Sequence, residues 1–212
     1  MDQAFLDEAL PALFRGLGNT IGFSLAGIAL GFALGAVVAA AAMAANPWPR
    51  LFAAVYVSFF RGVPLLVQVL IAFYAVPFIG IDVPPAGAAI GALGCCCAAY
   101  AAEILRGGLS LVPHGAVEAA RLLGLNARQT FLRIRLPIAI AAMRPALVSE
   151  AIMIVKASSL ISLVGILELT RSAQAIAANT FQPLPAYALC GMFYLVLNIV
   201  LSVLGGLARR RA

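Results

Sequence analysis

The sequence predicts an all-α integral membrane protein with about five transmembrane helices. Of its 212 residues, 64% are hydrophobic and only 10% are charged, and the mean hydropathy is +1.05. A soluble domain of this size needs far more charged residues to cover its surface. Apolar runs of about 20 residues, the length that crosses the hydrocarbon core, instead indicate lipid as the solvent. We expect residues 1–212 to form a single transmembrane domain.

The expected spans cover about residues 20–45, 51–78, 86–105, 136–155 and 187–207. The first carries Gly27, Gly31 and Gly35 on one helix face, a spacing that permits close contact with a neighbouring helix. The second is interrupted by Arg61, which is costly at the bilayer centre. We therefore interpret the second segment as an amphipathic entry followed by the true span from Pro64.

The distribution of arginines predicts the orientation of these spans. Five arginines lie in the hydrophilic loop of about residues 106–135, and three more form the tail Arg209–Arg211. An excess of positive charge marks cytoplasmic loops. The acidic residues Asp2 and Asp82 belong to the opposite side. The N-terminus is then periplasmic and the C-terminus cytoplasmic, and the net charge of +6 does not indicate nucleic-acid binding.

One motif stands out in the basic loop. Glu118-Ala119-Ala120 is followed after three residues by Gly124, and after nine more by Ile134-Arg135-Leu136-Pro137. We expect a short helix over Glu118–Leu123, ended by Gly124 in a left-handed conformation. The two alanines offer a small-residue surface to a partner protein, and Ile134 and Pro137 restart the chain as the next span. Such a helix, presented to a soluble partner, is typical of a coupling device.

This pattern resembles the EAA loop of ABC importer permeases, whose helix docks in a groove of the ATPase subunit. Other stretches are similar to permeases of polar amino acid importers, of the histidine, glutamine and arginine type: residues 16–20, 60–68, 100–108 and 156–165. The resemblance covers nearly the whole chain and implies a type I, MetI-like permease fold. It assigns ATPase coupling to Glu118, Ala119, Ala120, Gly124, Ile134, Leu136 and Pro137. At residues 113–116 the chain departs from the family pattern, so the role of His114 stays open.

The resemblance also implies partners and a location. These are two ABC ATPase subunits carrying ATP and Mg, a second permease chain that is identical or homologous, and a periplasmic substrate-binding protein, assembled in the bacterial inner membrane. The chain has no Gly-x-x-x-x-Gly-Lys-Ser/Thr loop, so ATP hydrolysis is expected on the separate ATPase. No catalytic residue, cofactor or metal is expected here. The adjacent Cys95–Cys97 lie in an apolar stretch and are expected to pack between helices.

Polar side chains at membrane depth are the candidates for the substrate pathway, because burying them unpaired is expensive. Glu150 is the first of them. It either meets an amino or cationic group of the substrate or forms an internal salt bridge with Arg144, Arg61 or Lys156. The secondary candidates are Gln68, Ser149, Ser158 and Ser159. Ser158 fits a helix N-cap equally well.

Two alternatives to a polar amino acid importer remain. In the first alternative, the chain is the same kind of permease but its substrate is an opine, ectoine or another small solute, since substrate choice resides largely in the binding protein. The second alternative is a gradient-driven secondary transporter, which suits intramembrane Glu150 but leaves the EAA loop without a purpose. A membrane-embedded enzyme is disfavoured, because no His, Asp and Glu cluster has the spacing of a metal or nucleophile site.

Overall fold

The computed structural model describes residues 3–78, 80 and 83–210. Asp2, Asp82 and Arg211 of the orientation argument lie outside the described residues. The α-helices are α1 (Gln3–Ala42), α2 (Pro47–Gly62), α3 (Leu65–Leu70), α4 (Val76–Phe78), α5 (Pro85–Ser110), α6 (His114–Leu122), α7 (Ala127–Thr130), α8 (Leu136–Ala157), α9 (Leu169–Thr180) and α10 (Pro183–Arg210). Two π-helical turns, η1 (Ile71–Ala75) and η2 (Phe131–Arg135), and one 3₁₀ helix, η3 (Ser158–Val164), join them.

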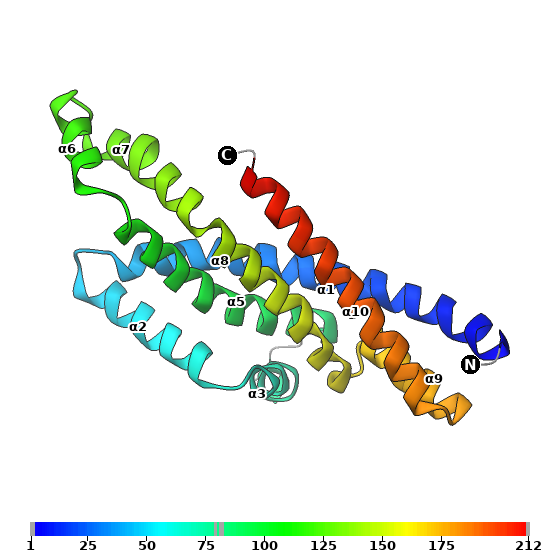
Figure 1. Ribbon diagram of the computed structural model, residues 1–212. Helices are drawn as coiled ribbons and strands as arrows, with labels where there is room; N and C mark the ends of the chain where they lie inside the picture. The colour runs from blue at the N-terminus through cyan, green and yellow to red at the C-terminus, as the bar shows by residue number, and fades with distance from the viewer. Residues whose placement is uncertain (1–2, 79, 81–82, 211–212) are drawn as a thin grey trace.

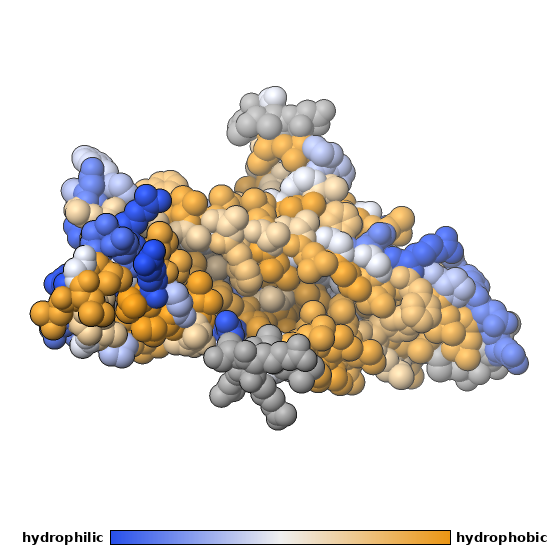
Figure 2. Space-filling view, turned by 90° about the horizontal axis from the view of Figure 1, so that it is seen from above, coloured by the Kyte–Doolittle hydropathy of each residue, from blue (hydrophilic) through white to orange (hydrophobic). Residues whose placement is uncertain are grey.

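Long apolar helices form an elongated bundle. Among the described residues, four helical segments are long and apolar enough to cross a membrane: Phe5–Ala42, Pro85–Ser110, Ala127–Val164 and Pro183–Gly206. The bent pair of α2 and α3–α4 adds a fifth if it is one broken span. Figure 1 places α6 at one end of the bundle, and α9 and the N-terminus at the other. Figure 2 shows a hydrophobic middle and hydrophilic patches towards the two ends, which is the surface expected of a membrane-spanning protein.

The first helix begins well before residue 20. Phe5, Ala9 and Leu13 are buried against α9 and α10, in a cluster that includes Leu169 and Ala173. Their spacing of four residues forms one apolar stripe on the helix. Asp7, Glu8 and Arg15 lower the mean hydropathy of the same segment, which hides the stripe in the sequence. Tertiary packing of this stripe therefore extends α1 beyond the purely apolar stretch.

The second expected span is broken between α2 and α3. The two helical parts differ in direction by 106°. Pro64 lacks an N–H and forces Val63 into an extended conformation, with φ −89° and ψ 131°. The segment expected to be the true span from Pro64 is short by length, because residues Leu65–Phe78 cover roughly 20 Å at about 1.5 Å per residue. Only α2 and α3–α4 together supply the apolar length of a span.

The fourth span also begins earlier than residue 136. Asn126 and Gln129 form a capping box, in which the Asn126 Oδ1 accepts from the Gln129 N–H at 2.9 Å and the Gln129 Oε1 accepts from the Asn126 N–H at 3.0 Å. From there α7, η2 and α8 run on as one helical segment. Ile134 and Pro137 therefore do not restart the chain, because both lie inside this segment. The π-helical turn directly precedes Pro137, where the ordinary helical ladder is already interrupted.

The glycines of α1 bring it into close contact with α5, as their spacing predicts. A Cβ atom added at Gly27 lies 3.0 Å from the Leu93 Cβ, and one added at Gly31 overlaps the side chain of Cys97. Cys97 is fully buried at this contact. The small residues thus replace side-chain volume with direct helix-to-helix packing.

Replacing Gly31 with valine is expected to destabilise the protein by about 2–3 kcal/mol or more, because the new side chain overlaps α5. Thermal unfolding of the purified chain in detergent measures this. Gly22→Val is the matched control on the same helix, since nothing lies within 4 Å of a Cβ at that position. Equal losses of thermal stability in the two variants contradict the close α1–α5 contact.

Candidate functional site

The short helix α6 ends at Gly124 as the sequence predicts. Gly124 is left-handed, with φ +77°. Its N–H donates to the carbonyl of Arg121 at 2.9 Å, and the N–H of Leu125 donates to the carbonyl of Ala120 at 3.1 Å. This pair of hydrogen bonds is the Schellman arrangement that closes a helix at a glycine. The helix begins at His114 rather than Glu118, with Pro113 at its N-cap.

The end of α6 presents apolar side chains outwards. Leu122 and Leu123 are 89% and 80% exposed. Glu118 and Ala119 are exposed as well, whereas Ala120 is buried. The small-residue surface expected from two alanines is therefore formed by Ala119 alone. Large exposed apolar side chains that lie together mark a contact with another protein or with a membrane. The sequence analysis missed both leucines, although their place directly before the helix-ending glycine is a usable signal.

The base of α6 is anchored to the membrane-spanning helices. Val117 packs against the buried cluster of Val112, Ala139 and Met143, to which α5 also contributes through partly buried side chains. Ala139 and Met143 belong to α8. α6 also contacts α7 and η2, which continue into α8, so the helix is joined to the α8 span both through this cluster and along the chain.

Glu150 lies in a pocket at the break between α2 and α3, away from α6. The pocket has a volume of about 400 Å³. Three segments line it: the break itself (Phe60, Arg61, Gly62, Val63, Pro64 and Leu65), α5 (Cys96 and Tyr100) and α8 (Glu150, Met153, Ile154 and Ala157). The carboxyl side chain of Glu150 and the guanidinium group of Arg61 thus belong to one cavity.

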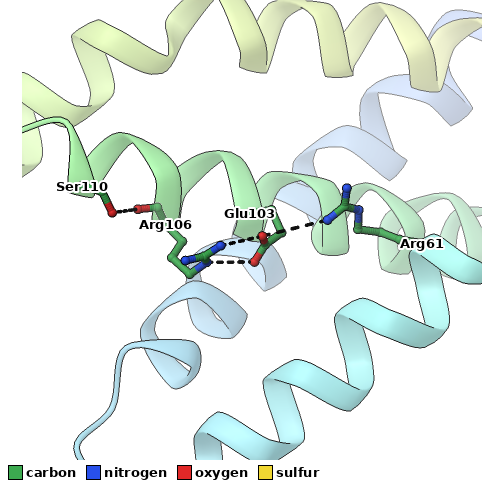
Figure 3. Close-up of polar contacts among 4 residues, drawn as sticks. All are labelled: Arg61, Glu103, Arg106 and Ser110. Carbon is green, nitrogen blue, oxygen red and sulfur yellow. Dashed lines mark hydrogen bonds and ion pairs between the residues drawn. The ribbon is translucent and has the colours of Figure 1, made fainter.

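Arg61 is held at this pocket by α5. Its guanidinium lies over the Tyr100 ring, 5.2 Å from the ring centroid, and 3.9 Å from the Glu103 carboxylate. Figure 3 shows Glu103 between Arg61 and Arg106, which approaches it to 2.9 Å. Arg61 therefore makes its ion pair with Glu103 rather than with Glu150. The sequence analysis missed Glu103, although its spacing of three residues from Arg106 is that of a helical ion pair.

The other substrate candidates do not line the Glu150 pocket. The Ser149 hydroxyl donates to the Pro145 carbonyl at 3.0 Å, and the Ser159 hydroxyl to the Lys156 carbonyl at 2.8 Å. Ser158 is not an N-cap, because its hydroxyl donates backwards to the Val155 carbonyl at 2.8 Å. The Gln68 amide donates to the carbonyls of Phe60 and Val63, at 2.9 and 2.8 Å, and so satisfies the end of α2. Gln68 thus holds the backbone of two residues that line the pocket, Phe60 and Val63, but does not line the pocket itself.

The cysteines are divided between packing and the pocket. Cys97 packs beneath α1, and Cys96 lines the pocket of Glu150. Within residues 3–78, 80 and 83–210, no three His, Cys, Asp or Glu side chains gather where they could hold a metal ion.

A buried carboxyl group, Glu168, joins α1, α9 and α10 at the opposite end of the bundle. It accepts hydrogen bonds from the N–H groups of Thr170 at 2.9 Å and Arg171 at 2.7 Å, and from the Tyr194 hydroxyl at 2.8 Å. The Thr20 hydroxyl of α1 accepts from the adjacent Leu169 N–H at 3.0 Å. Burial raises the pKa of Glu168, and its hydrogen bonds act against this. The sequence analysis missed this residue, which caps α9.

Replacing Glu168 with alanine is expected to lower the free energy of unfolding by about 3 kcal/mol, because two helix N–H groups and a buried hydroxyl lose their acceptor. Tyr194→Phe removes only one of these hydrogen bonds and is expected to cost about 1 kcal/mol. Thermal unfolding in detergent tests both, with Glu8→Ala at an exposed position of α1 as the control. A loss for Glu168→Ala no larger than the control's contradicts the capping role.

The family of the chain follows from its sequence match. Residues 31–212 match the family model described as "binding-protein-dependent transport system inner membrane component". The chain belongs to this family. The inner membrane component is a multi-pass transport subunit, and membership of this family implies a binding protein and an ATPase as its partners.

Curated relatives of this inner membrane component are permease proteins of similar length. The octopine transport system permease protein OccM of Rhizobium meliloti is 35% identical over 211 residues, which cover 94% of this chain and 85% of that protein. The glutamine transport system permease protein GlnP of Escherichia coli (strain K12) is 34% identical over 213 residues, covering 99% of this chain and 97% of that protein.

Solved structures confirm the expected MetI-like fold of the inner membrane component. The crystal structure of an amino acid ABC transporter with histidines contains a chain of 31% identity and TM-score 0.93, with 100% of this chain and 99% of that chain covered. The MetNI methionine ABC transporter in an inward-facing conformation gives a TM-score of 0.82 at 20% identity, with 100% and 99% covered, and this likeness concerns the fold alone.

Proposed function

We propose that this chain is the permease subunit of an ATP-driven ABC importer that carries polar amino acids across the bacterial inner membrane. The observation that carries the substrate class is the pocket shared by Glu150 and Arg61. A carboxylate and a guanidinium in one cavity match the ammonium and carboxylate groups of a zwitterionic amino acid. Relatives named for glutamine transport support this class, and those named for octopine keep an opine as the alternative substrate.

Coupling to ATP takes place through α6 in this proposal. Two ATPase subunits bind ATP and Mg, and each receives one α6 helix of a permease pair whose second member is identical or homologous. The exposed Leu122 and Leu123 enter the ATPase groove. This places α6 and the C-terminus in the cytoplasm, and the N-terminus and α9 on the periplasmic side, where a binding protein delivers the substrate.

The α8 helix provides a direct mechanical link between the two sites. Met143, near one end, packs beneath α6, and Glu150, further along the same helix, lines the pocket. The two positions are about two helical turns apart, or roughly 10 Å. Closure of the ATPase dimer therefore moves α6, and α8, which has Pro145 between the two positions, carries the displacement to Glu150. Alternating access follows from this shared element.

Uptake by vesicles tests the proposal. The chain is reconstituted with its ATPase and binding protein, and a panel of labelled amino acids and opines is offered. We expect uptake of at least one polar amino acid that depends on ATP and survives a protonophore. Uptake that stops with a protonophore but persists without ATP supports the gradient-driven transporter instead. Uptake of opines alone overturns the substrate class but leaves the permease assignment intact.

A further inference from the structure

A second pocket, of about 630 Å³, lies beside α6 at the end of the membrane-spanning helices. Arg121 from α6 and Arg135 from η2 line it, together with His114. Met43, directly after α1, and Leu109, near the end of α5, line the same pocket. The lining is therefore half cationic and half apolar, and it joins four separate elements.

The two arginines of this cationic pocket make no ion pair with an acidic side chain among the residues that the structure describes. In the described part of the chain, ion pairs within 4.0 Å join Glu103 to Arg61 and Arg106. Arg106 also lines the pocket, but Glu103 already neutralises its guanidinium. Arg121 and Arg135 thus face the same cavity with no carboxylate beside them. Like charges in one cavity repel, so the site favours an anion as its occupant.

The position of the cationic pocket identifies the kind of anion. Met43 and Leu109 mark the level at which two membrane-spanning helices end, which is the level of the lipid headgroups. A phospholipid presents the matching combination, a phosphate beside an apolar body, whereas a free phosphate leaves the apolar half of the lining unused. We propose that this pocket binds the phosphate headgroup of an anionic phospholipid.

The bound lipid has a structural consequence for α6. Its phosphate bridges Arg121 on the helix to Arg135 at the start of the α8 span, and its apolar part contacts the ends of α1 and α5. The lipid thereby fixes α6 relative to the spans and strengthens the contact that Val117 provides. This inference concerns lipid binding by the chain itself, so it stands apart from the substrate and from the ATPase.

Native mass spectrometry of the full chain in detergent tests the proposal, with phosphatidylglycerol as the probe. We expect one phosphatidylglycerol per chain to be retained. The double variant Arg121→Gln/Arg135→Gln is expected to bind it roughly thirtyfold more weakly, since each arginine near a membrane surface contributes about fivefold. The matched control Arg128→Gln/Arg133→Gln removes the same charge from the same loop outside the pocket, and is expected to bind normally.

Further arms separate the possible occupants. If the double variant does not fold, Arg121→Gln alone, at an exposed position of α6, is expected to lower affinity about fivefold. Equal weakening in the double variant and its control overturns the site, as does equal retention of phosphatidylcholine. Displacement of the lipid by millimolar inorganic phosphate assigns the pocket to a free anion. Loss of the ATPase from the assembled complex, with lipid retention unchanged, assigns the two arginines to a protein interface.

Discussion

Replacing Gly124 with valine is expected to reduce ATP-driven uptake more than tenfold while the chain stays in the membrane. The left-handed conformation of this residue, with φ +77°, costs a non-glycine residue about 1–2 kcal/mol, and a β-branched one more. Relief of this strain breaks the two hydrogen bonds that close α6. Leu122 and Leu123 then leave their docking positions. Copurification of the ATPase and vesicle uptake measure the effect.

Gly124→Asn is the matched control for this change. Asparagine also adds a side chain at an exposed position, but it adopts the left-handed conformation readily. Nothing lies within 4 Å of a Cβ at Gly124, so neither variant creates a clash inside the chain. We expect the asparagine variant to retain ATPase binding and most of the uptake. Normal assembly and uptake by the valine variant contradict the coupling role of α6.

Replacing Glu150 with glutamine is expected to slow uptake of cationic and zwitterionic amino acids by about ten- to hundredfold. Glutamine keeps the size of the side chain but removes the negative charge that, in the proposed function, meets the substrate ammonium, and a charge-assisted hydrogen bond contributes about 1.5–3 kcal/mol. Because Glu150 makes no ion pair with Arg61, the change leaves the Arg61–Glu103 contact in place. Initial uptake rates at low substrate concentration measure the expected slowing of transport.

Ser149→Ala provides the control for Glu150→Gln. It lies next to Glu150 on α8, and its hydroxyl bonds the Pro145 carbonyl rather than lining the pocket. We expect near-normal uptake by this variant, and membrane levels of both variants equal to the wild type. Unchanged transport of the whole amino acid panel by Glu150→Gln removes this residue from the substrate pathway.

The local features of α6 and of the glycine face of α1 were predictable because they depend on neighbours in sequence. A glycine that closes a short helix, a run of basic residues and a pattern of spaced glycines are each recognisable without knowledge of the fold. The limits of α1 and α8 were less predictable. The apolar stripe of Phe5, Ala9 and Leu13 is diluted by charges on the other face, and the capping box at Asn126 lies far from the apolar stretch that it introduces.

The sequence by itself determined that this chain is a membrane-spanning permease with a short helix that Gly124 ends. Hydropathy and glycine conformation depend on short stretches of chain, so both can be recognised from the sequence alone. Only the tertiary structure decided which polar side chains meet. It brought Arg61 of α2 and Glu150 of α8 into one pocket, and buried Glu168 against Tyr194 of α10. These contacts depend on how helices distant in sequence cross, and no local pattern specifies that crossing.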